Sequence, residues 1–550
     1  MSERGRFENV PSKMNRNSKC NPMKKSSFLS CLSAVLIMLP IALSGQAGEQ
    51  SPQESITEAE MRDHIYFLAS DYMKGRVGPS PEYEIAAQYV ASQFAQAGLE
   101  PIQTELECMD GFFQLVPFEK GVYSADINWI MQTSNGEKEF LHNKDFKVLE
   151  DGIIPDAPLE VVFAGYGIEE PDHGWNDFED IDIEHKMVVV LSGAPLKKGK
   201  PVLPEALHKE YTSMQGLQKK AMPVIMKNPA AIILALDPET ASMVPFGKIP
   251  SSFTEINYTY TGPTEDGNQF RIPMVYLVRD EVLQALFEGQ KFGPADMEEK
   301  GMKKYRCYQL EDIIVDTRFP LKEKSELTLK NVVGMVKGSD PELSKEVIVV
   351  GAHLDHVVGP GGQVNNGADD NASGSAGVME IAEAVAMDPP KRSVVFVTYT
   401  AEEMGLYGSH FFVNSGPFDI GDMKFNVNLD MIGRTTKENS ESGSHYLVAN
   451  ETYMPKIKPF IEEINAKELG IPLIYDTSHS GSSDHANFQA AGIPAFFFFS
   501  GVHRDLHTPG DDPEKIEYEK AVRLAKLAYQ VTMQLATMDA VPAFRAEVME

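Results

Sequence analysis

The sequence is poor in cysteine and in positive charge, and each shortage excludes a class of protein. Its 4 cysteines in 550 residues are too few for a disulfide-rich scaffold or a cysteine zinc ribbon. Only Cys108 and Cys307 lie beyond the start of the chain, and sequence alone does not decide whether they pair. Against 80 acidic residues there are 50 basic ones, giving a formal net charge of −30. This charge argues against binding nucleic acid or anionic lipid through bulk electrostatics.

Long apolar runs are also missing, except near the start. Residues 1–47 hold seven basic and two acidic residues, an apolar run from Phe28 to Leu43, and small residues up to Ala47. This pattern predicts a secretory leader cleaved near Ala47, and hence a protein exported to the periplasm or the extracellular space. We expect no stable membrane insertion after cleavage. An uncleaved membrane anchor is the alternative, because the run approaches the ~17 residues that can span a bilayer.

The length of the chain indicates two folded domains behind the leader. Residues 48–127 and 307–540 are predicted to form the two parts of the main domain, and residues 128–306 a smaller, β-rich insertion. In the last part, near-continuous apolar runs alternate with helical stretches, which predicts an α/β fold with a mostly parallel central sheet flanked by helices. The predicted strands there are Val347–Val350, Val394–Thr398, Phe425–Leu429 and Ala495–Phe499.

Candidate ligands follow these strands. The loops of such a sheet gather reactive side chains beyond the strand ends, although each residue alone has an ordinary explanation, such as a helix cap for the acids near residue 370. The candidates at or just past strand ends, or in a glycine-flanked turn, are His353, Asp355, Asp370, Glu402, Glu403, Asp430 and His507.

Five of these side chains suit a pair of metal ions. Two histidines and three carboxylates are one ligand too many for a single tetrahedral ion. If one carboxylate bridges two ions, each ion receives one histidine, one acid and the bridge, and a water can sit between ions roughly 3.5–4 Å apart. Nitrogen and oxygen donors without cysteine favour zinc, with manganese or cobalt as substitutes. One of the paired glutamates Glu402 and Glu403 could then take a proton from water.

These segments resemble the zinc exopeptidases that include secreted bacterial leucyl aminopeptidases, glutamate carboxypeptidases and glutaminyl cyclases. The resemblance implies two Zn²⁺ per chain, with Asp370 bridging and Glu402 as general base. It also implies His353 and Asp430 on one ion, Glu403 and His507 on the other, and Asp355 behind His353. The matching stretches are Gly351–His356, Gly367–Gly374, Ala401–Gly405, Asn428–Gly433, Ser483–Phe488, Gly492–Ala495 and His507–Thr508.

The predicted insertion also resembles a known unit, the protease-associated domain found in many members of that family. Such a domain would line the rim of the active-site cleft, and a passive insertion is the alternative. The similar stretches are Val161–Ile168, Gly174–Asp177, Lys186–Val190 and Ala230–Ile233.

The resemblance implies an aminopeptidase that cleaves peptides with a free N-terminus. A glutamate-type carboxypeptidase is the alternative, but it needs arginines to hold a terminal carboxylate, and Arg434 is the one basic residue close to a predicted ligand. A glutaminyl cyclase would use a single zinc, and an inactive binding scaffold would have lost ligands. A serine hydrolase is disfavoured because no Gly-x-Ser-x-Gly segment follows a predicted strand. His356, Asp484 and His485 are expected near the site without an assigned role.

Overall fold

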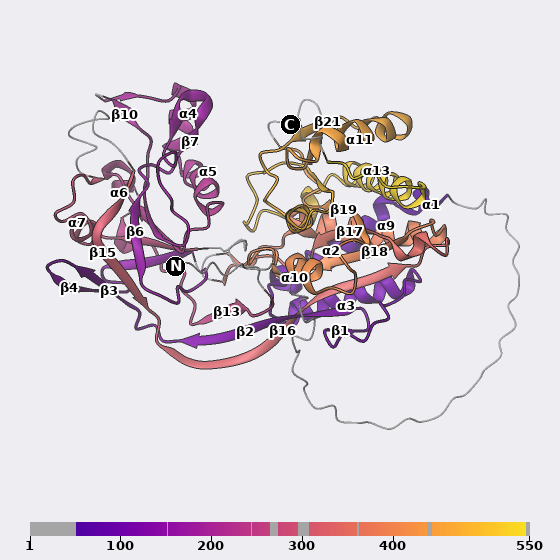
Figure 1. The fold of residues 1–550 in the computed structure, drawn as a ribbon, viewed down its shortest axis with the longest axis horizontal. Coiled ribbons are helices and arrows are strands. Elements are labelled where there is room, and N and C mark those ends of the chain that lie inside the picture. Colours follow the sequence, from indigo (N-terminus) through magenta and orange to yellow (C-terminus); the bar gives the residue numbers. More distant parts are fainter. Residues whose placement is uncertain are drawn as a thin grey trace, which may run out of the picture.

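The computed structural model describes residues 51–545 except 151, 198, 244, 264–272, 295–306, 360–361 and 437–442. The predicted leader therefore lies outside the described residues. Two large sheets dominate the fold (Figure 1). The first runs in the order β1-β2-β16-β18-β17-β19-β22-β20-β21, with β13 also paired to β2. Its strands are β1 (Met109–Asp110), β2 (Phe113–Tyr123), β13 (Ile256–Tyr260), β16 (Leu321–Val336), β17 (Val347–His353), β18 (Ser393–Tyr399), β19 (Met423–Leu429), β20 (His445–Val448), β21 (Leu473–Asp476) and β22 (Ala495–Phe499).

Only the centre of this sheet is a continuous parallel ladder. Strands β18, β17, β19 and β22 run parallel to one another, whereas β16 and β20 join the two sides of this group antiparallel. The predicted α/β class is confirmed, with antiparallel flanks that the apolar runs did not indicate. Helices cover both faces: α1 (Pro52–Ser55), α2 (Glu58–Leu68), α3 (Pro81–Gln96), α9 (Gly374–Met387), α10 (Tyr407–Ser415), α11 (Met454–Glu468), α12 (His485–Ala490) and α13 (Tyr518–Thr537).

Burial on both faces explains why the central strands are apolar throughout. Every residue of β17 is buried. Because side chains alternate along a strand, Ile348 and Val350 join the core formed with α2, α3, α9 and α13. Val347 and Val349 point the other way and pack with Phe412 of α10 and other apolar side chains. This two-sided packing holds the carboxyl ends of the parallel strands in fixed positions.

The second sheet has eight strands in the order β4-β3-β15-β6-β9-β12-β14-β5 and its own apolar core. The described helices that accompany it are α4 (Glu205–Tyr211), α5 (Met214–Ile225), α6 (Pro238–Met243) and α7 (Asp280–Leu286). Two short pairs complete it, β7 (Glu169–Glu170) with β8 (Trp175–Asn176) and β10 (Leu196–Lys197) with β11 (Lys200–Pro201). The eight strands are β3 (Asn128–Thr133), β4 (Gly136–Leu141), β5 (Phe146–Glu150), β6 (Leu159–Phe163), β9 (Met187–Leu191), β12 (Ala231–Ala235), β14 (Met274–Val278) and β15 (Tyr308–Arg318).

Two long strands connect the sheets. β2 and β16 pair antiparallel from Phe113 and Val332 in the first sheet to Tyr123 and Leu321 near the second, and both ribbons run beneath the two lobes in Figure 1. Strand β15, which the sequence places after the predicted boundary at residue 306, pairs with β3 and β6 of the second sheet. Conversely, β13 comes from the predicted insertion and pairs with β2 of the first sheet.

The two cysteines beyond the leader belong to different parts of the fold. The sulfur of Cys108 lies 3.9 Å from the carbonyl oxygen of Ser415, and that of Cys307 lies 3.9 Å from Oδ1 of Asp177. They do not bridge. Among the described residues, none of the helices combines the length and the apolar character that a membrane crossing requires.

Candidate metal centre

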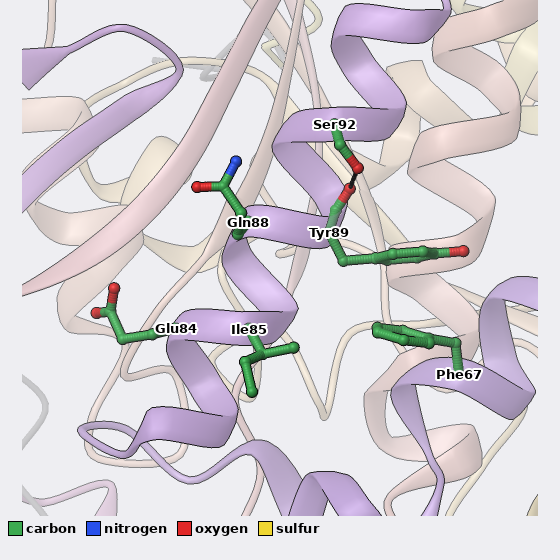
Figure 2. Close-up of a pocket in the computed structure, with 6 residues that line it drawn as sticks. All are labelled: Phe67, Glu84, Ile85, Gln88, Tyr89 and Ser92. Atoms are coloured by element: carbon green, nitrogen blue, oxygen red, sulfur yellow. Dashed lines mark hydrogen bonds between the residues drawn. The ribbon is translucent and has the colours of Figure 1, made fainter.

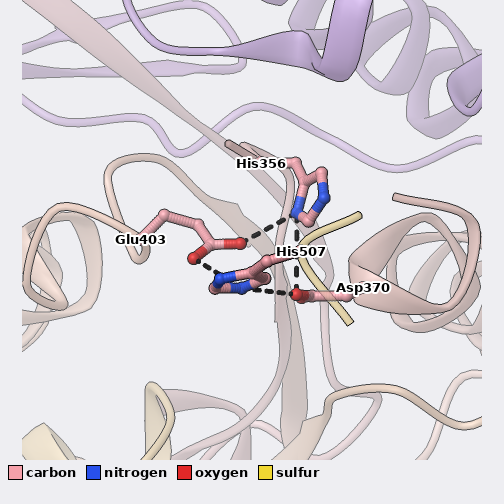
Figure 3. Close-up of side chains that lie close together, drawn as sticks. All are labelled: His356, Asp370, Glu403 and His507. Carbon is pink, nitrogen blue, oxygen red and sulfur yellow. Dashed lines mark hydrogen bonds and ion pairs between the residues drawn. The ribbon is translucent and has the colours of Figure 1, made fainter. Parts of the chain in front are cut away.

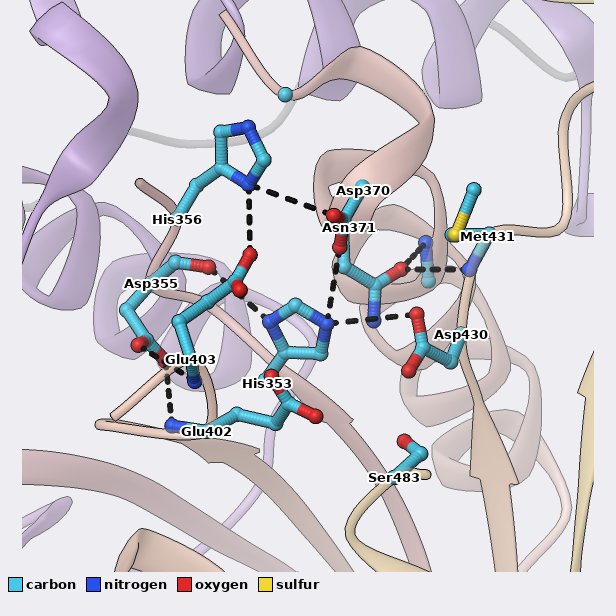
Figure 4. A network of polar contacts seen from close by, with 12 residues as sticks. His353, Asp355, His356, Asp370, Asn371, Glu402, Glu403, Asp430, Met431 and Ser483 are labelled. Atoms are coloured by element: carbon cyan, nitrogen blue, oxygen red, sulfur yellow. Dashed lines mark hydrogen bonds and ion pairs between the residues drawn. The ribbon is translucent and has the colours of Figure 1, made fainter. Parts of the chain in front are cut away.

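The predicted ligands come together at the carboxyl edge of the parallel strands. His353 is the last residue of β17, and Asp430 directly follows β19. Glu403 lies in the loop between β18 and α10, and His507 in the loop after β22. Asp370 belongs to the turn before α9, and Figures 3 and 4 show these side chains pointing toward one another.

Asp370 occupies the middle of the cluster, and its two oxygens face different partners. Its Oδ1 lies 3.3 Å from Nε2 of His353, which is also 3.4 Å from Oδ1 of Asp430. Its Oδ2 lies 3.0 Å from Nε2 of His507, which is also 3.2 Å from Oε2 of Glu403. A carboxylate that presents one oxygen to each of two donor sets has the arrangement that a bridging ligand needs.

The charges of the cluster fit two dications. Asp370, Glu402, Glu403 and Asp430 bring four carboxylates into one small volume, where their mutual repulsion requires compensating positive charge. Nitrogen and oxygen donors without sulfur are the set that zinc accepts. The side chain of His507 is 47% exposed, so the cluster is open to solvent on that side.

Glu402 differs from its neighbour in its electrostatic surroundings. Desolvation raises the pKa of Glu402 well above the usual value, and the negative charges of Glu403 and Asp430 add to this increase while His353 opposes it. For Glu403, desolvation is outweighed by His507 and His356, and its pKa falls to about 2. Adjacent glutamates thus differ in proton affinity: Glu402 binds a proton more readily, whereas Glu403 keeps its negative charge, as acid–base catalysis beside a metal requires.

Asp355 contacts a different group from the one that the sequence suggested. Nδ1 of His353 lies 3.0 Å from the backbone carbonyl oxygen of Asp355, not from its carboxylate. The carboxylate instead accepts the backbone N–H groups of Glu402, at 3.1 Å, and Glu403, at 3.3 Å. The backbone after β17 places the carbonyl against the imidazole, and the side chain of Asp355 reaches the next loop. Asp355 therefore holds the loop that carries both glutamates.

The neighbouring Asp369 points away from the centre. Its Oδ1 accepts the backbone N–H of Gly433 at 2.6 Å, and its Oδ2 lies 3.3 Å from Nε2 of His503. The turn thus sends one aspartate into the cluster and the other behind it.

Two buried residues that sequence reasoning missed hold these loops from behind. Arg76 is fully buried and donates to the backbone carbonyls of Leu68, Leu354, Asn366 and Gly367. Three of these carbonyls lie next to the cluster in the chain: that of Leu354 directly follows His353, and those of Asn366 and Gly367 come shortly before Asp370. Arg76 stands in a polar stretch with Asp71 and Lys74, so its burial has no local sequence signal, although a buried arginine needs several acceptors.

The second missed residue is Asp511, four positions after His507. Its Oδ1 lies 3.0 Å from the backbone nitrogen of Asp369, and its Oδ2 lies 3.0 Å from those of Asp369 and Asp370. Through these bonds the loop of His507 fixes the backbone of the central aspartate.

Asp511→Asn is expected to weaken zinc binding roughly 10–100-fold, the usual cost of losing a partner behind a ligand. The amide offers one accepting oxygen for three short contacts, so the position of Asp370 loosens. Competition with a zinc-binding dye measures the affinity. Asp505→Asn is the matched control, because Asp505 lies in the same loop but pairs with Arg434 and Lys515. Equal affinity in the two variants would show that Asp511 has no such role.

His485, at the start of α12, makes the folded protein sensitive to acid. It is fully buried with its ring centroid 4.5 Å from that of Phe497, and burial lowers its pKa to about 3. An unfolded histidine titrates near 6.5. Below that pH the unfolded state binds the extra proton, so stability falls as pH drops from about 6.5 towards 3, by up to ~1.4 kcal/mol per unit.

Replacing His485 with phenylalanine is therefore expected to flatten this dependence. Between pH 6.5 and 4.5 the variant should lose ~2 kcal/mol less unfolding free energy than the parent. Urea unfolding of chelator-treated protein measures the difference without a contribution from metal loss. Identical slopes in both proteins would contradict the assignment to His485.

A surface pocket of about 510 Å³ lies elsewhere, on α2 and α3 (Figure 2). Its lining contains no member of the metal cluster, so the pocket is separate from this centre. The lining residues are Phe67, Glu84, Ile85, Gln88, Tyr89 and Ser92.

The site lies at the carboxyl edge of a parallel sheet, and its histidines and carboxylates surround one central aspartate. This arrangement is typical of α/β proteins that hold a metal centre at that edge. Residues 331–532 match the model of peptidase family M28. The predicted resemblance to zinc exopeptidases is confirmed for this segment. The resemblance of the second sheet to a protease-associated domain stays a prediction.

Named relatives match part of the chain. A probable leucine aminopeptidase 2 of Trichophyton verrucosum is 35% identical over 180 residues, which are 32% of this chain and 34% of the relative. The aminopeptidase YwaD of Bacillus subtilis is 29% identical over 208 residues, 36% of this chain and 43% of its own. The match thus spans less than half the length of either relative. A solved aminopeptidase from Aneurinibacillus sp. strain AM-1 shares the fold with a TM-score of 0.50 and 20% identity, over 90% of this chain and 98% of that one.

Proposed function

We propose that the protein is a two-zinc aminopeptidase that removes residues from the free N-terminus of peptides. The observation that carries the proposal is the placement of Asp370, whose oxygens face His353 and His507 on opposite sides. Asp370 would bridge the ions, with His353 and Asp430 holding one and Glu403 and His507 the other. The aminopeptidase names of the M28 relatives support the same activity.

A bound zinc pair supplies Lewis-acid polarisation of the scissile carbonyl and acidifies the attacking water. The protein's own residues do the rest. Glu402 takes the proton of the water and passes it to the leaving amine, a transfer favoured by the raised pKa of its carboxyl group. Asp355 keeps Glu402 in place by accepting its backbone N–H.

Charge near the centre favours an aminopeptidase over a carboxypeptidase. Arg434, the candidate for holding a terminal carboxylate, is already engaged: its guanidinium lies 2.9 Å from Asp505 and 3.7 Å from Asp511. The acids Glu402, Asp430 and Asp484 instead lie close enough to raise one another's pKa, and a protonated α-amine beside them would favour their charged forms. An inactive scaffold on the same fold lacks support, because every predicted ligand lies in the cluster.

The second sheet is proposed to border the substrate cleft. A Cβ added at Gly481, in the loop before α12, would come within 2.5 Å of Cε of Met226, just past α5. The helix α5, which accompanies the second sheet, therefore ends beside the loop that leads to Asp484. Export through the predicted leader of residues 1–47 remains part of the proposal and rests on the composition of that segment.

A peptide panel tests the activity. Purified protein is assayed with one peptide in three forms: free at both ends, N-acetylated, and C-terminally amidated. An aminopeptidase cleaves the first and third and spares the second, whereas a carboxypeptidase spares the third. Chelation should abolish cleavage and added zinc should restore it. Cleavage of the acetylated form, or full activity after demetallation, would refute the proposal.

A further inference from the structure

His356 lies inside the metal cluster, although the predicted ligand set does not include it. It follows β17 by three residues, and its side chain is completely buried. We propose that His356 is a further ligand of the ion that Glu403 and His507 hold. That ion would then have four protein donors and its neighbour three. The inference rests on the proposed two-zinc function and adds that the two ions differ in their number of protein ligands.

The distances around His356 match a tetrahedral ion. Its Nδ1 lies 2.9 Å from Oε1 of Glu403 and 3.6 Å from Oδ2 of Asp370 (Figure 3). His507 completes the set of four, because its Nε2 lies 3.0 Å from Asp370 and 3.2 Å from Glu403. Donors ~2.0–2.1 Å from a tetrahedral zinc are roughly 3.3 Å apart. The observed separations scatter around this value, and donor atoms of all four residues lie within 4.8 Å of one another.

The backbone beside His356 holds the ring in this position. Gly367 has a left-handed conformation with φ +60, and a Cβ there would come within 2.5 Å of the His356 ring. The ring therefore packs directly on the glycine backbone. Arg76 in turn donates to the carbonyl of Gly367 at 3.0 Å. Nε2 of His356 is buried with no hydrogen-bond partner in the described part of the chain, so Nδ1 is the nitrogen that meets polar atoms.

Unequal ligand numbers imply unequal roles. Four protein donors complete a tetrahedral shell, as in structural zinc sites, whereas three leave a position open, as in catalytic sites. His353, Asp370 and Asp430 form the three-donor set. The ion at His356 should therefore bind first and leave last, and the ion at His353 should exchange more readily and offer the open position.

The alternative role for His356 is a hydrogen bond from Nδ1–H to Glu403 with no contact to the metal. His356→Asn separates the two roles, because the asparagine amide can stand where Nδ1 stands and still donate to Glu403, yet it is a poor zinc ligand. His64→Asn is the matched control. His64 is a largely buried histidine of α2, paired with Tyr89 and Glu380 outside the cluster.

The experiment titrates the metal-free full chain with Co²⁺ and Zn²⁺, followed by visible absorption and calorimetry. The parent and the His64 variant should bind a first ion more tightly than a second. In His356→Asn the first affinity should fall ~100-fold or more, beyond the usual cost of losing an outer partner, and the cobalt spectrum should change. Unchanged affinity and spectrum in this variant would overturn the inference while leaving the two-zinc function intact.

X-ray absorption of the parent loaded with one equivalent of zinc gives a test that needs no variant. Two imidazole donors on that ion would support the inference, and one would overturn it. A parent protein that binds no zinc in the titration would refute the proposed function itself, so the two failures are distinguishable.

Discussion

Replacing Glu402 with glutamine is expected to lower kcat by ~10²–10⁴-fold, the usual contribution of a general base. Glutamine keeps the size of the side chain but cannot accept the proton of the attacking water. Because Glu402 is not in the proposed ligand set, the variant should bind zinc with the stoichiometry of the parent. Steady-state kinetics together with metal analysis of the same preparation measure both quantities.

Glu380→Gln is the matched control for this variant. Glu380 is also a buried glutamate, but it belongs to α9 and pairs with His64. Its replacement should alter stability and leave kcat close to that of the parent. Full turnover in Glu402→Gln would remove the assignment of the general base, and zinc loss in that variant would place Glu402 among the ligands.

Asp370→Asn is expected to remove both zinc ions and to reduce activity below detection. An amide has one oxygen to offer and no charge to offset the repulsion between two dications. Asp430→Asn, by contrast, alters one ion only and should retain close to one zinc per chain. Metal analysis after gel filtration measures the stoichiometry in each variant.

The comparison between these two variants is the sharpest test of a shared carboxylate. Equal zinc content in Asp370→Asn and Asp430→Asn would mean that Asp370 serves a single ion. Circular dichroism of both proteins checks that the fold survives. Asp370 also carries a backbone contact to Asp511, which the substitution leaves in place.

Much of the site could be predicted because parallel strands bring their carboxyl ends to one edge. His353 ends β17 and Asp430 follows β19, so the apolar runs place both residues at the carboxyl edge, and the pairing of the two strands in the structure makes them neighbours. The antiparallel flanks could not be predicted, since β16 and β2 read as ordinary strands until their pairing is known.

The supporting contacts were beyond the reach of sequence patterns for a physical reason. Arg76 meets the carbonyl of Leu354 across 278 positions of chain, and Asp511 meets the backbone of Asp370 across 141. Such bonds join a side chain to a backbone group. Because every residue has a backbone carbonyl and nearly every residue a backbone N–H, no local motif marks the partner. The bonds from the backbone N–H groups of Glu402 and Glu403 to the carboxylate of Asp355 escape prediction for the same reason.

The pairing of Tyr123 with Leu321 has a consequence for the history of the chain. The chain leaves the first sheet at one of these residues and returns to it at the other. The two face each other across an antiparallel pair of strands, about 5 Å apart. A short hairpin turn could close that gap. A gene could therefore have acquired or lost the whole segment between Tyr123 and Leu321 without changing the order or direction of the remaining strands.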